Sequence, residues 1–339
     1  MLVSLALLLF LLCHGTGKVD GHSSDMLALL HFKMPIIAAA SDPNGALKSW
    51  NEKHPVLPVG RRFLHPEAPQ ACDSADVVAN CSNLRTIDLY HNNLVGEIPL
   101  KLGLLSNLVV LRLSRNRLSG MVPRTISNTS HIEKIALSYN QLTGNIPGEL
   151  GQLLDLSYLA LGGNNLSGGI PHSLLNKSSL QVLAMESNRV GGTLPPSIGD
   201  ALPDLQMLVL GRNLLRGYIP ASLGNASNLM LVDLSSNNFA GTVGEWIRKL
   251  MNLTYLHLND NNLMGQILSS VTNNTQLTLL NLKNNYFVGS IPSSVSNRSQ
   301  LSFLSLANNS FTGSIPSSIS NLSQLSTLSL ANNFQGIVP

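Results

Sequence analysis

The sequence has few charged and few aromatic residues. Charged residues make up 12% of the 339, about half the share usual in soluble domains, and aromatic residues make up 5%. The net charge of +3 is small and spread along the chain, so it indicates neither a nucleic-acid-binding protein nor a membrane-surface protein. This composition is a poor match to an average compact globular domain.

Long apolar runs are absent after the first residues. Later Leu-rich stretches are broken by Asn, Ser, Gly or Pro within a few positions, so none reaches the roughly 20 residues of a membrane-spanning helix. The opening "MLVSLALLLFLLCHGTGK" is apolar from Leu2 to Cys13 and then continues with small residues, although it lacks a basic start. We predict a cleaved secretory signal in residues 1–22, with an uncleaved anchor as the alternative.

Cysteine is scarce as well. Of the three cysteines, Cys13 leaves with the signal, so only Cys72 and Cys81 remain. In the repeat register described below, Cys81 takes the place of a buried leucine, and a Cys72–Cys81 disulfide is the alternative.

The side-chain patterns of catalysis and metal binding are also missing. The nine histidines show no His-x-x-x-His spacing, and no Cys-x-x-Cys pair is present. The chain has no glycine-rich phosphate loop, no His-Arg-Asp and no Asp-Phe-Gly. We therefore predict no enzymatic activity, no metal and no cofactor for this chain.

What the sequence does have is a repeat. One copy reads "LVVLRLSRNRLSGMVPRTISNTSH", residues 108–131, and most copies follow LxxLxLxxNxLxGxIPxxL. The steps are 24 residues long, with one of 25. The copies begin at Leu84, Leu108, Ile132, Leu156, Leu180, Leu205, Leu229, Leu253, Leu277, Leu301 and Leu325.

Each fixed letter of the repeat has a physical role. Leu111 and Leu113 point to one side of a short strand that cannot bury them alone, so stacked copies should form a parallel sheet about 50 Å long. Asn116 should satisfy backbone groups in the turn after the strand. Gly120 permits a positive φ, and Pro123 fixes a bend.

The LxGxIP half, as in "LTGNIP" (142–147) and "FTGSIP" (311–316), is the variant found in plant leucine-rich repeats. From Leu84 onward the chain resembles the extracellular domain of plant leucine-rich-repeat receptor-like kinases. Residues 23–51, "SSDMLALLHFKMPIIAAASDPNGALKSWN", look like the N-terminal cap of that family. The resemblance implies an α/β repeat solenoid, curved, with a parallel β-sheet on its concave face and a helical N-terminal cap in residues 23–52.

The chain departs from the family pattern in three places. Residues 53–75 form an atypical linker without the usual cysteine pair, and Pro35 interrupts the expected cap helix. The repeats, residues 76–339, begin with a partial copy and end with a shortened one, "TLSLANNFQGIVP". No further repeats, spanning helix or kinase follow. We interpret the end as a truncation, full-length relatives being serine/threonine receptor kinases.

The outward positions of the strands are the candidate ligand surface. One column is apolar over seven consecutive repeats, which indicates either a peptide contact or lateral packing at the sheet margin. The next column is small in its middle, and Gly162, Gly163 and Gly211 beside it should leave a shallow trough. We predict ligand contacts from Tyr158, Met207, Asp233, Tyr255, His257, Arg112 and Phe303.

Two further surface features follow from the sequence. Arg112, Arg115, Arg117 and Lys134 should cluster on neighbouring repeats, where they either bind a carboxylate or an acidic pectin fragment or form a solvated face. Ten Asn-x-Ser/Thr sequons predict glycosylation in a secreted chain. They lie at Asn80, Asn128, Asn165, Asn176, Asn225, Asn252, Asn273, Asn297, Asn308 and Asn321.

The resemblance implies a ligand-binding ectodomain, or a truncated receptor-like protein, that recognises a peptide or a cell-wall fragment, with a co-receptor as a further partner. It implies a location outside the cell, or at the plasma membrane if the full-length gene encodes a spanning helix. One alternative is a secreted inhibitor similar to plant polygalacturonase inhibitors, although their terminal cysteine pairs are missing here. The other is a non-functional fragment.

Overall fold

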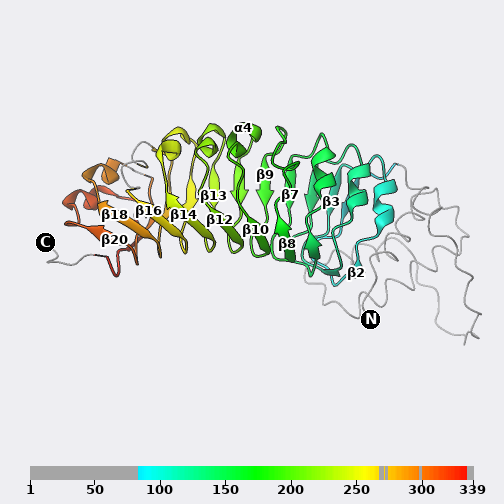
Figure 1. Ribbon diagram of the computed structural model, residues 1–339, viewed down its shortest axis with the longest axis horizontal. Helices are drawn as coiled ribbons and strands as arrows, with labels where there is room; N and C mark the ends of the chain where they lie inside the picture. Colours follow the sequence, from blue (N-terminus) through cyan, green and yellow to red (C-terminus); the bar gives the residue numbers. More distant parts are fainter. Residues whose placement is uncertain (1–82, 267–270, 272–273, 298–299, 334–339) are drawn as a thin grey trace, which may run out of the picture.

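A computed structural model describes residues 83–266, 271, 274–297 and 300–333. Within these ranges the chain is a solenoid of stacked coils that runs from β2 at one end of the view to β20 at the other (Figure 1). The predicted signal, cap helix and linker lie outside the described residues. So do Cys72, Cys81, Asn80 and Asn273.

One parallel sheet runs the whole length of the described solenoid. Its eleven strands pair with their neighbours in the next repeat, in register, as in Leu111 with Ile135. Strands of only three residues suffice because each is held on both sides by the adjacent coils. They are β1 (Thr86–Asp88), β3 (Val110–Arg112), β5 (Lys134–Ala136), β7 (Tyr158–Ala160), β9 (Val182–Ala184), β11 (Met207–Val209), β13 (Leu231–Asp233), β15 (Tyr255–His257), β17 (Leu279–Asn281), β19 (Phe303–Ser305) and β21 (Thr327–Ser329).

The leucines of the repeat form one continuous core behind this sheet. Leu111 and Leu113 are fully buried, whereas Arg112 between them is exposed, so the predicted alternation is confirmed. Phe239, Phe287 and Phe311 replace leucine at the position of Leu118, and all three are buried. No single coil forms a hydrophobic core of its own, and each depends on its neighbours to bury its apolar side chains.

The repeated asparagine binds two neighbouring coils together. The side-chain amide of Asn116 donates to the carbonyls of Leu89 and Leu113, both at 2.9 Å, and its Oδ1 accepts the N–H of Leu94 at 3.1 Å. Because Asn116 is only 9% exposed, these bonds satisfy backbone groups that water cannot reach. The predicted role of this asparagine is confirmed.

The Gly-containing half of the repeat forms a second set of parallel strands on the flank. Gly120 has a φ of +74°, as predicted, in the turn that ends β4. The strands are β2 (Val95–Glu97), β4 (Arg117–Ser119), β6 (Thr143–Asn145), β8 (Asn165–Gly169), β10 (Arg189–Gly192), β12 (Leu214–Gly217), β14 (Asn238–Thr242), β16 (Asn262–Gly265), β18 (Tyr286–Ser290) and β20 (Ser310–Thr312).

Short helices complete most of the described coils on the side away from the eleven-stranded sheet. Most are single 3₁₀ turns that follow the repeat's proline: η2 (Leu100–Leu104), η3 (Arg124–Asn128), η4 (Gly148–Gln152), η5 (Ala221–Asn225), η6 (Glu245–Lys249), η7 (Ser293–Asn297) and η8 (Ser317–Asn321), with the α-helical turn α4 (Ile198–Ala201). In the described part of the chain no helix has the length and hydropathy to cross a membrane.

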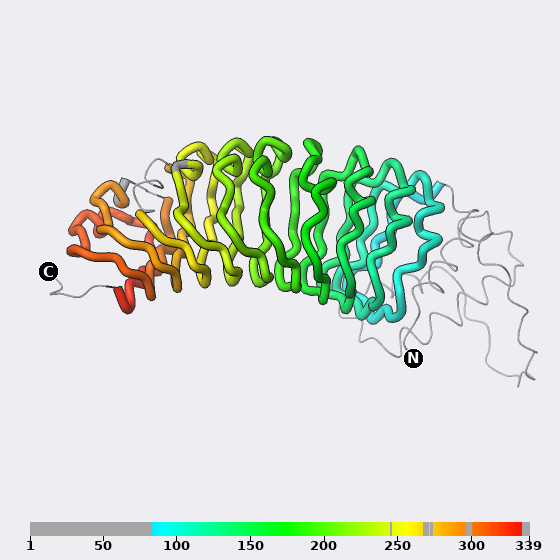
Figure 2. Tube along the Cα trace, in the orientation of Figure 1, coloured from blue at the N-terminus to red at the C-terminus, as the bar shows by residue number. Residues whose placement is uncertain are grey.

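The stacked coils follow an arch (Figure 2). Strands stack at about 4.8 Å, which is closer than helical turns can pack, so the solenoid bends with the eleven-stranded sheet on its inner side. We call the outward-pointing side chains of this sheet, and of the turn after each strand, the concave face.

Candidate ligand-binding face

The apolar column predicted from the sequence is continuous. Strand register places each member beside the next, as for Leu231, Tyr255 and Leu279. Tyr255 is 43% exposed, and the other six side chains are half-buried. The column comprises Tyr158, Val182, Met207, Leu231, Tyr255, Leu279 and Phe303. It offers apolar and aromatic contact area along seven coils.

The trough beside this column is not empty, because Glu186 fills part of it. Its carboxylate lies directly over Gly162, in the space where a side chain at that position would be. The Oε2 atom is buried and has no hydrogen-bond partner. Burial raises the pKa of the Glu186 carboxyl; a hydrogen bond to its own backbone opposes the shift, and the charge of Asp233 adds to it.

A second carboxylate lies over the next glycine of the trough. Both carboxylate oxygens of Asp233 lie close to Gly211. Oδ1 of Asp233 accepts hydrogen bonds from the backbone N–H of Ser235 at 2.9 Å and from its hydroxyl at 2.6 Å. His257 is the strand neighbour of Asp233, yet within the described residues this carboxylate is hydrogen-bonded to Ser235 and not to His257.

An arginine–tyrosine cluster lies near the first repeats. Arg112 forms an ion pair with Asp88 at 3.1 Å and stacks over Tyr90 at 4.2 Å from the ring centroid. Arg115 lies 5.9 Å from the Tyr90 ring and 5.5 Å from the Tyr139 ring, a cation–π arrangement with both.

Of the other two basic residues expected in this cluster, Arg117 lies in the flanking strand β4, and Lys134 lies in β5, the strand next to that of Arg112. Whether the four act together stays a prediction.

Sequence reasoning placed Tyr158, Met207, Asp233, Tyr255, His257 and Phe303 on one face, and strand register confirms that placement. Whether these residues contact a ligand stays a prediction. Glu186 was missed. The available signal was its place in the column of Gly162 and Gly211, where small neighbours leave room for a longer side chain to turn inward.

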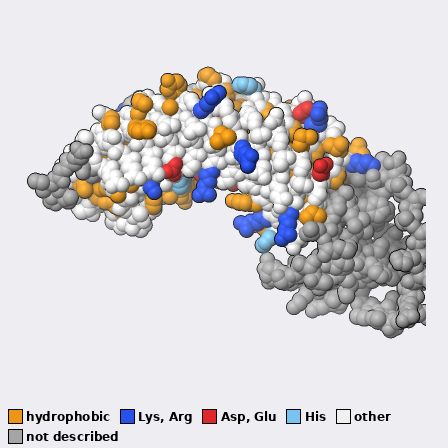
Figure 3. Space-filling view, turned by 60° about the horizontal axis from the view of Figure 1, so that its bottom comes forward, with side chains coloured by type: hydrophobic (Ala, Val, Ile, Leu, Met, Phe, Trp, Pro, Cys, Tyr) orange, Lys and Arg blue, Asp and Glu red, His pale blue; other side chains and the backbone are white. Residues whose placement is uncertain are grey.

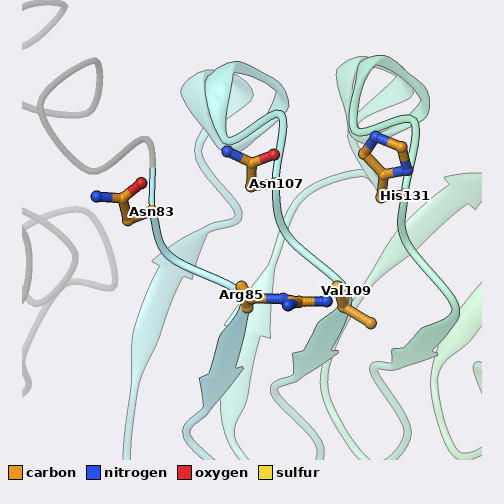
Figure 4. Close-up of a pocket in the computed structure, with 5 residues that line it drawn as sticks. All are labelled: Asn83, Arg85, Asn107, Val109 and His131. Atoms are coloured by element: carbon orange, nitrogen blue, oxygen red, sulfur yellow. The ribbon is translucent and has the colours of Figure 1, made fainter.

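The measurable hollows lie elsewhere. One, of about 350 Å³, is lined by Asn83, Arg85, Asn107, Val109 and His131 in the turns that lead into the first strands (Figure 4). His131 also lies 3.8 Å from Asp155, a contact between two exposed side chains. A second, of about 380 Å³, lies beside α4 on the helical side. Neither is part of the concave face.

Charge is sparse over the surface. Charged side chains are few and scattered in the space-filling view, and uncharged surface dominates (Figure 3). The described residues hold no group of three or more His, Cys, Asp or Glu side chains that could bind a metal ion. The carboxylates of Glu186 and Asp233 have no ion-pair partner among the described residues.

The sequons fall mostly on exposed asparagines. Seven have exposed side chains: Asn128, Asn165, Asn176, Asn225, Asn252, Asn308 and Asn321. Asn308 lies at the edge of the concave face, where its amide donates to Asn284 and accepts from Asn332 at 2.7 Å. Asn297 ends η7, and its side chain is not described. Glycosylation at every sequon stays a prediction.

The repeat architecture agrees with family models. A leucine rich repeat model matches residues 106–166, and a second one matches residues 83–105, 252–274, 276–297 and 300–322. The chain is a leucine-rich-repeat protein. Among curated protein sequences, none matches it.

Solved structures with the same architecture come largely from plant receptors. The plant peptide hormone receptor RGFR1, in complex with RGF2, is 30% identical over 74% of this leucine-rich-repeat chain and 44% of its own, with a TM-score of 0.65. The Arabidopsis receptor kinase HAESA, with the peptide hormone IDA and the co-receptor SERK1, is 27% identical over 78% and 52%, with a TM-score of 0.59.

A plant ice-binding protein is also similar, at 26% identity over 75% of this chain and 82% of its own, with a TM-score of 0.65. The leucine-rich-repeat chain spans about half the length of the receptor chains it matches. Since one solenoid serves both receptors and an ice-binding protein, the fold does not select the function, and the argument must rest on the concave face.

Proposed function

We propose that this leucine-rich-repeat protein is a ligand-binding ectodomain that holds an extended peptide on its concave face. The observation that carries the proposal is the continuous apolar column, which lies beside a column with small residues at Ala160 and Ala184. Tyr and Phe side chains supply contact area at low entropy cost, and the small column leaves room for a backbone. RGFR1 and HAESA, which are similar over three quarters of this chain, were solved with peptide ligands.

The peptide would lie across the strands and contact one coil about every 4.8 Å. Tyr158, Met207, Tyr255 and Phe303 supply apolar contacts in this arrangement, and Asp233 and His257 supply polar ones. A co-receptor would complete the complex, as SERK1 does in the HAESA structure. We place the protein outside the cell, in accordance with its exposed sequons.

A displayed library of random peptides tests this proposal. We expect the purified chain to select peptides, and we expect the double variant Tyr158→Ala/Tyr255→Ala to bind them about tenfold or more weakly, as truncation of interface aromatics commonly does. The matched control is Tyr218→Ala/Tyr286→Ala, whose side chains are exposed on the flank at 74% and 59%. Equal binding by both double variants would overturn the proposal.

A cell-wall fragment is the second candidate ligand, favoured by the arginine–tyrosine cluster. Arg112 already has Asp88 as a partner, but Arg115 is held between two tyrosine rings and presents its charge to solvent. An oligogalacturonide, which carries one carboxylate per sugar, would then bind with strong salt dependence. Its binding should weaken in Arg115→Gln and persist in the tyrosine double variant Tyr158→Ala/Tyr255→Ala.

A further inference from the structure

The two carboxylates of the trough lack the partners that such groups normally have. In Glu186, Oε2 is buried and accepts no hydrogen bond. In Asp233, Oδ1 accepts two hydrogen bonds, but both come from the neutral Ser235. Negative charge that is partly removed from water is costly unless a cation or several donors compensate for it.

No ion pair joins either carboxylate to a basic group of the described residues, and the exposed Arg212 follows Gly211 in the coil between them. The ion pairs found in that part of the chain join Arg112 to Asp88 and His131 to Asp155, and neither includes Glu186 or Asp233. His257 is the strand neighbour of Asp233, but the ion pairs of the described residues do not include one between them. The trough therefore presents two carboxylates without an ion-pair partner among the described residues.

The surrounding side chains define how a cation would reach it. The two glycines, Gly162 and Gly211, form the floor under the carboxylates, since any side chain there would meet them. Ala160 and Ala184 separate the trough from the apolar column and present little bulk. A side chain that starts from a backbone on the apolar column can cross these alanines with its methylene groups and place its charged end over the glycines.

We propose that Glu186 and Asp233 form a subsite for a cationic side chain of the bound peptide, with arginine as the preferred residue. The inference rests on the proposed function and adds the chemistry of one ligand position. The two carboxylates lie over coils that are two steps apart, roughly 10 Å. A guanidinium has donors on opposite sides of its plane and can address both, whereas a lysine ammonium is a compact point charge that addresses one.

The test is a double-mutant cycle between protein and peptide. Peptides selected by the wild-type chain from a random displayed library are synthesised with arginine and with citrulline, its neutral isostere, at the enriched basic position. Binding is measured to the wild type and to Glu186→Gln/Asp233→Asn. The matched control is Glu149→Gln/Asp204→Asn, which makes the same charge change off the concave face.

We expect citrulline to weaken binding to the wild type and to the control by about tenfold or more, the scale of a hydrogen bond to a charged group. On Glu186→Gln/Asp233→Asn the same replacement should change affinity less than twofold. Arginine should also bind the wild type more tightly than lysine does. Because citrulline alters only the peptide, a folding defect in a protein variant cannot produce this pattern.

Three results would overturn the subsite. The first is that the selected peptides contain no basic residue. The second is that citrulline weakens binding equally in all three proteins. The third is that lysine and arginine peptides bind the wild type equally well, while the citrulline effect is the same in Glu186→Gln/Asp233→Asn as in the wild type. If such peptides still lose affinity for Tyr158→Ala/Tyr255→Ala, the proposed function stands and only the subsite fails. If the wild type selects no peptide at all, both fail.

Discussion

The carboxylate of Glu186 occupies the space above Gly162 that a side chain at that position would need. This relationship couples two positions 24 residues apart, and it explains why a charged residue in a turn is half-buried. The atoms that a methyl group on Gly162 would meet all belong to the end of a flexible side chain, not to the backbone. We therefore expect a small side chain at Gly162 to change the stability of the protein little and the electrostatic environment of Glu186 strongly.

We predict that Gly162→Ala leaves the free energy of unfolding within about 0.5 kcal/mol of wild type, because the Glu186 side chain can rotate into solvent. Once solvated, the Glu186 carboxyl should recover a pKa near its ordinary value, since burial is the main cause of its raised pKa. Carbon-detected NMR titration of glutamate side chains measures this change.

The comparison variant for this prediction is Gly199→Ala. A methyl group on Gly199 would meet the backbone carbonyl of Ser222, which cannot rotate away. Gly199→Ala should therefore destabilise the protein by about 1–3 kcal/mol. Equal stability of the two alanine variants would contradict the distinction.

Glu186→Gln should raise the melting temperature at neutral pH by about 1–3 °C, because it removes a half-buried charge that has no basic partner among the described residues. The pKa of Glu186 is raised in the folded state, so its contribution to stability is greatest below the ordinary value of 4.5 and is lost as pH rises through the folded pKa. The advantage of the variant should then close as pH falls toward 4.5.

Thermal unfolding of wild type and Glu186→Gln between pH 4.5 and 7.5 tests this sign. Glu149→Gln, in η4 on the helical side, serves as the charge-matched control. A gap that stays constant across this pH range would show that the effect has another origin.

The 24-residue period predicted the parallel sheet, its register and the role of Asn116, because each of these follows from a residue that recurs in every coil. The flanking strands were not predicted. β8 reads Asn165–Gly169 and contains two glycines, a composition that intrinsic preference would not assign to a strand. It is extended because the neighbouring coils pair with it.

The orientation of Glu186 does not follow from the repeat consensus alone, because it depends on the glycine at the same position of the preceding coil, Gly162. The same limit applies to Asp233 and His257. Strand register brought these residues together, but a nearer donor, Ser235, binds the carboxylate. The repeat period determines which residues share a column of the sheet, whereas the hydrogen-bond partner of each side chain depends on the residues around it.

Removing one repeated asparagine should weaken the solenoid strongly. The Asn213 amide donates to the carbonyls of Met185 at 2.9 Å and Leu210 at 3.0 Å, and its Oδ1 accepts the N–H of Val190 at 3.0 Å. Asn213→Ala leaves buried backbone groups without partners, so we expect a loss of about 2–4 kcal/mol in the free energy of unfolding.

Urea unfolding followed by circular dichroism measures this loss. Asn228→Ala provides the control, since Asn228 is exposed and makes one long hydrogen bond, to the carbonyl of Pro203 at 3.4 Å. It should change the free energy of unfolding by less than about 0.5 kcal/mol. Similar losses in both variants would mean that asparagine acts through local turn preference and not through its buried bonds.

A buried lysine offers a stabilising change. Lys177 is 6% exposed and occupies the repeat position that holds Leu153 in an earlier coil and Leu202 in the next. Burial lowers the pKa of Lys177, and the nearby charge of Asp155 opposes that shift. The methylene stem suits the apolar site, but the ammonium group does not.

Lys177→Met keeps the length of the side chain and removes the charge, so we expect the melting temperature at pH 7 to rise by about 2–4 °C. Because the pKa of Lys177 is lowered by folding, the wild type recovers stability as pH rises toward the ordinary value of 10.5, and the gap between the two proteins should narrow there. Lys283→Met, at an exposed position, should show neither effect. A destabilised Lys177→Met would instead mean that the attraction between Lys177 and Asp155 outweighs the cost of burial.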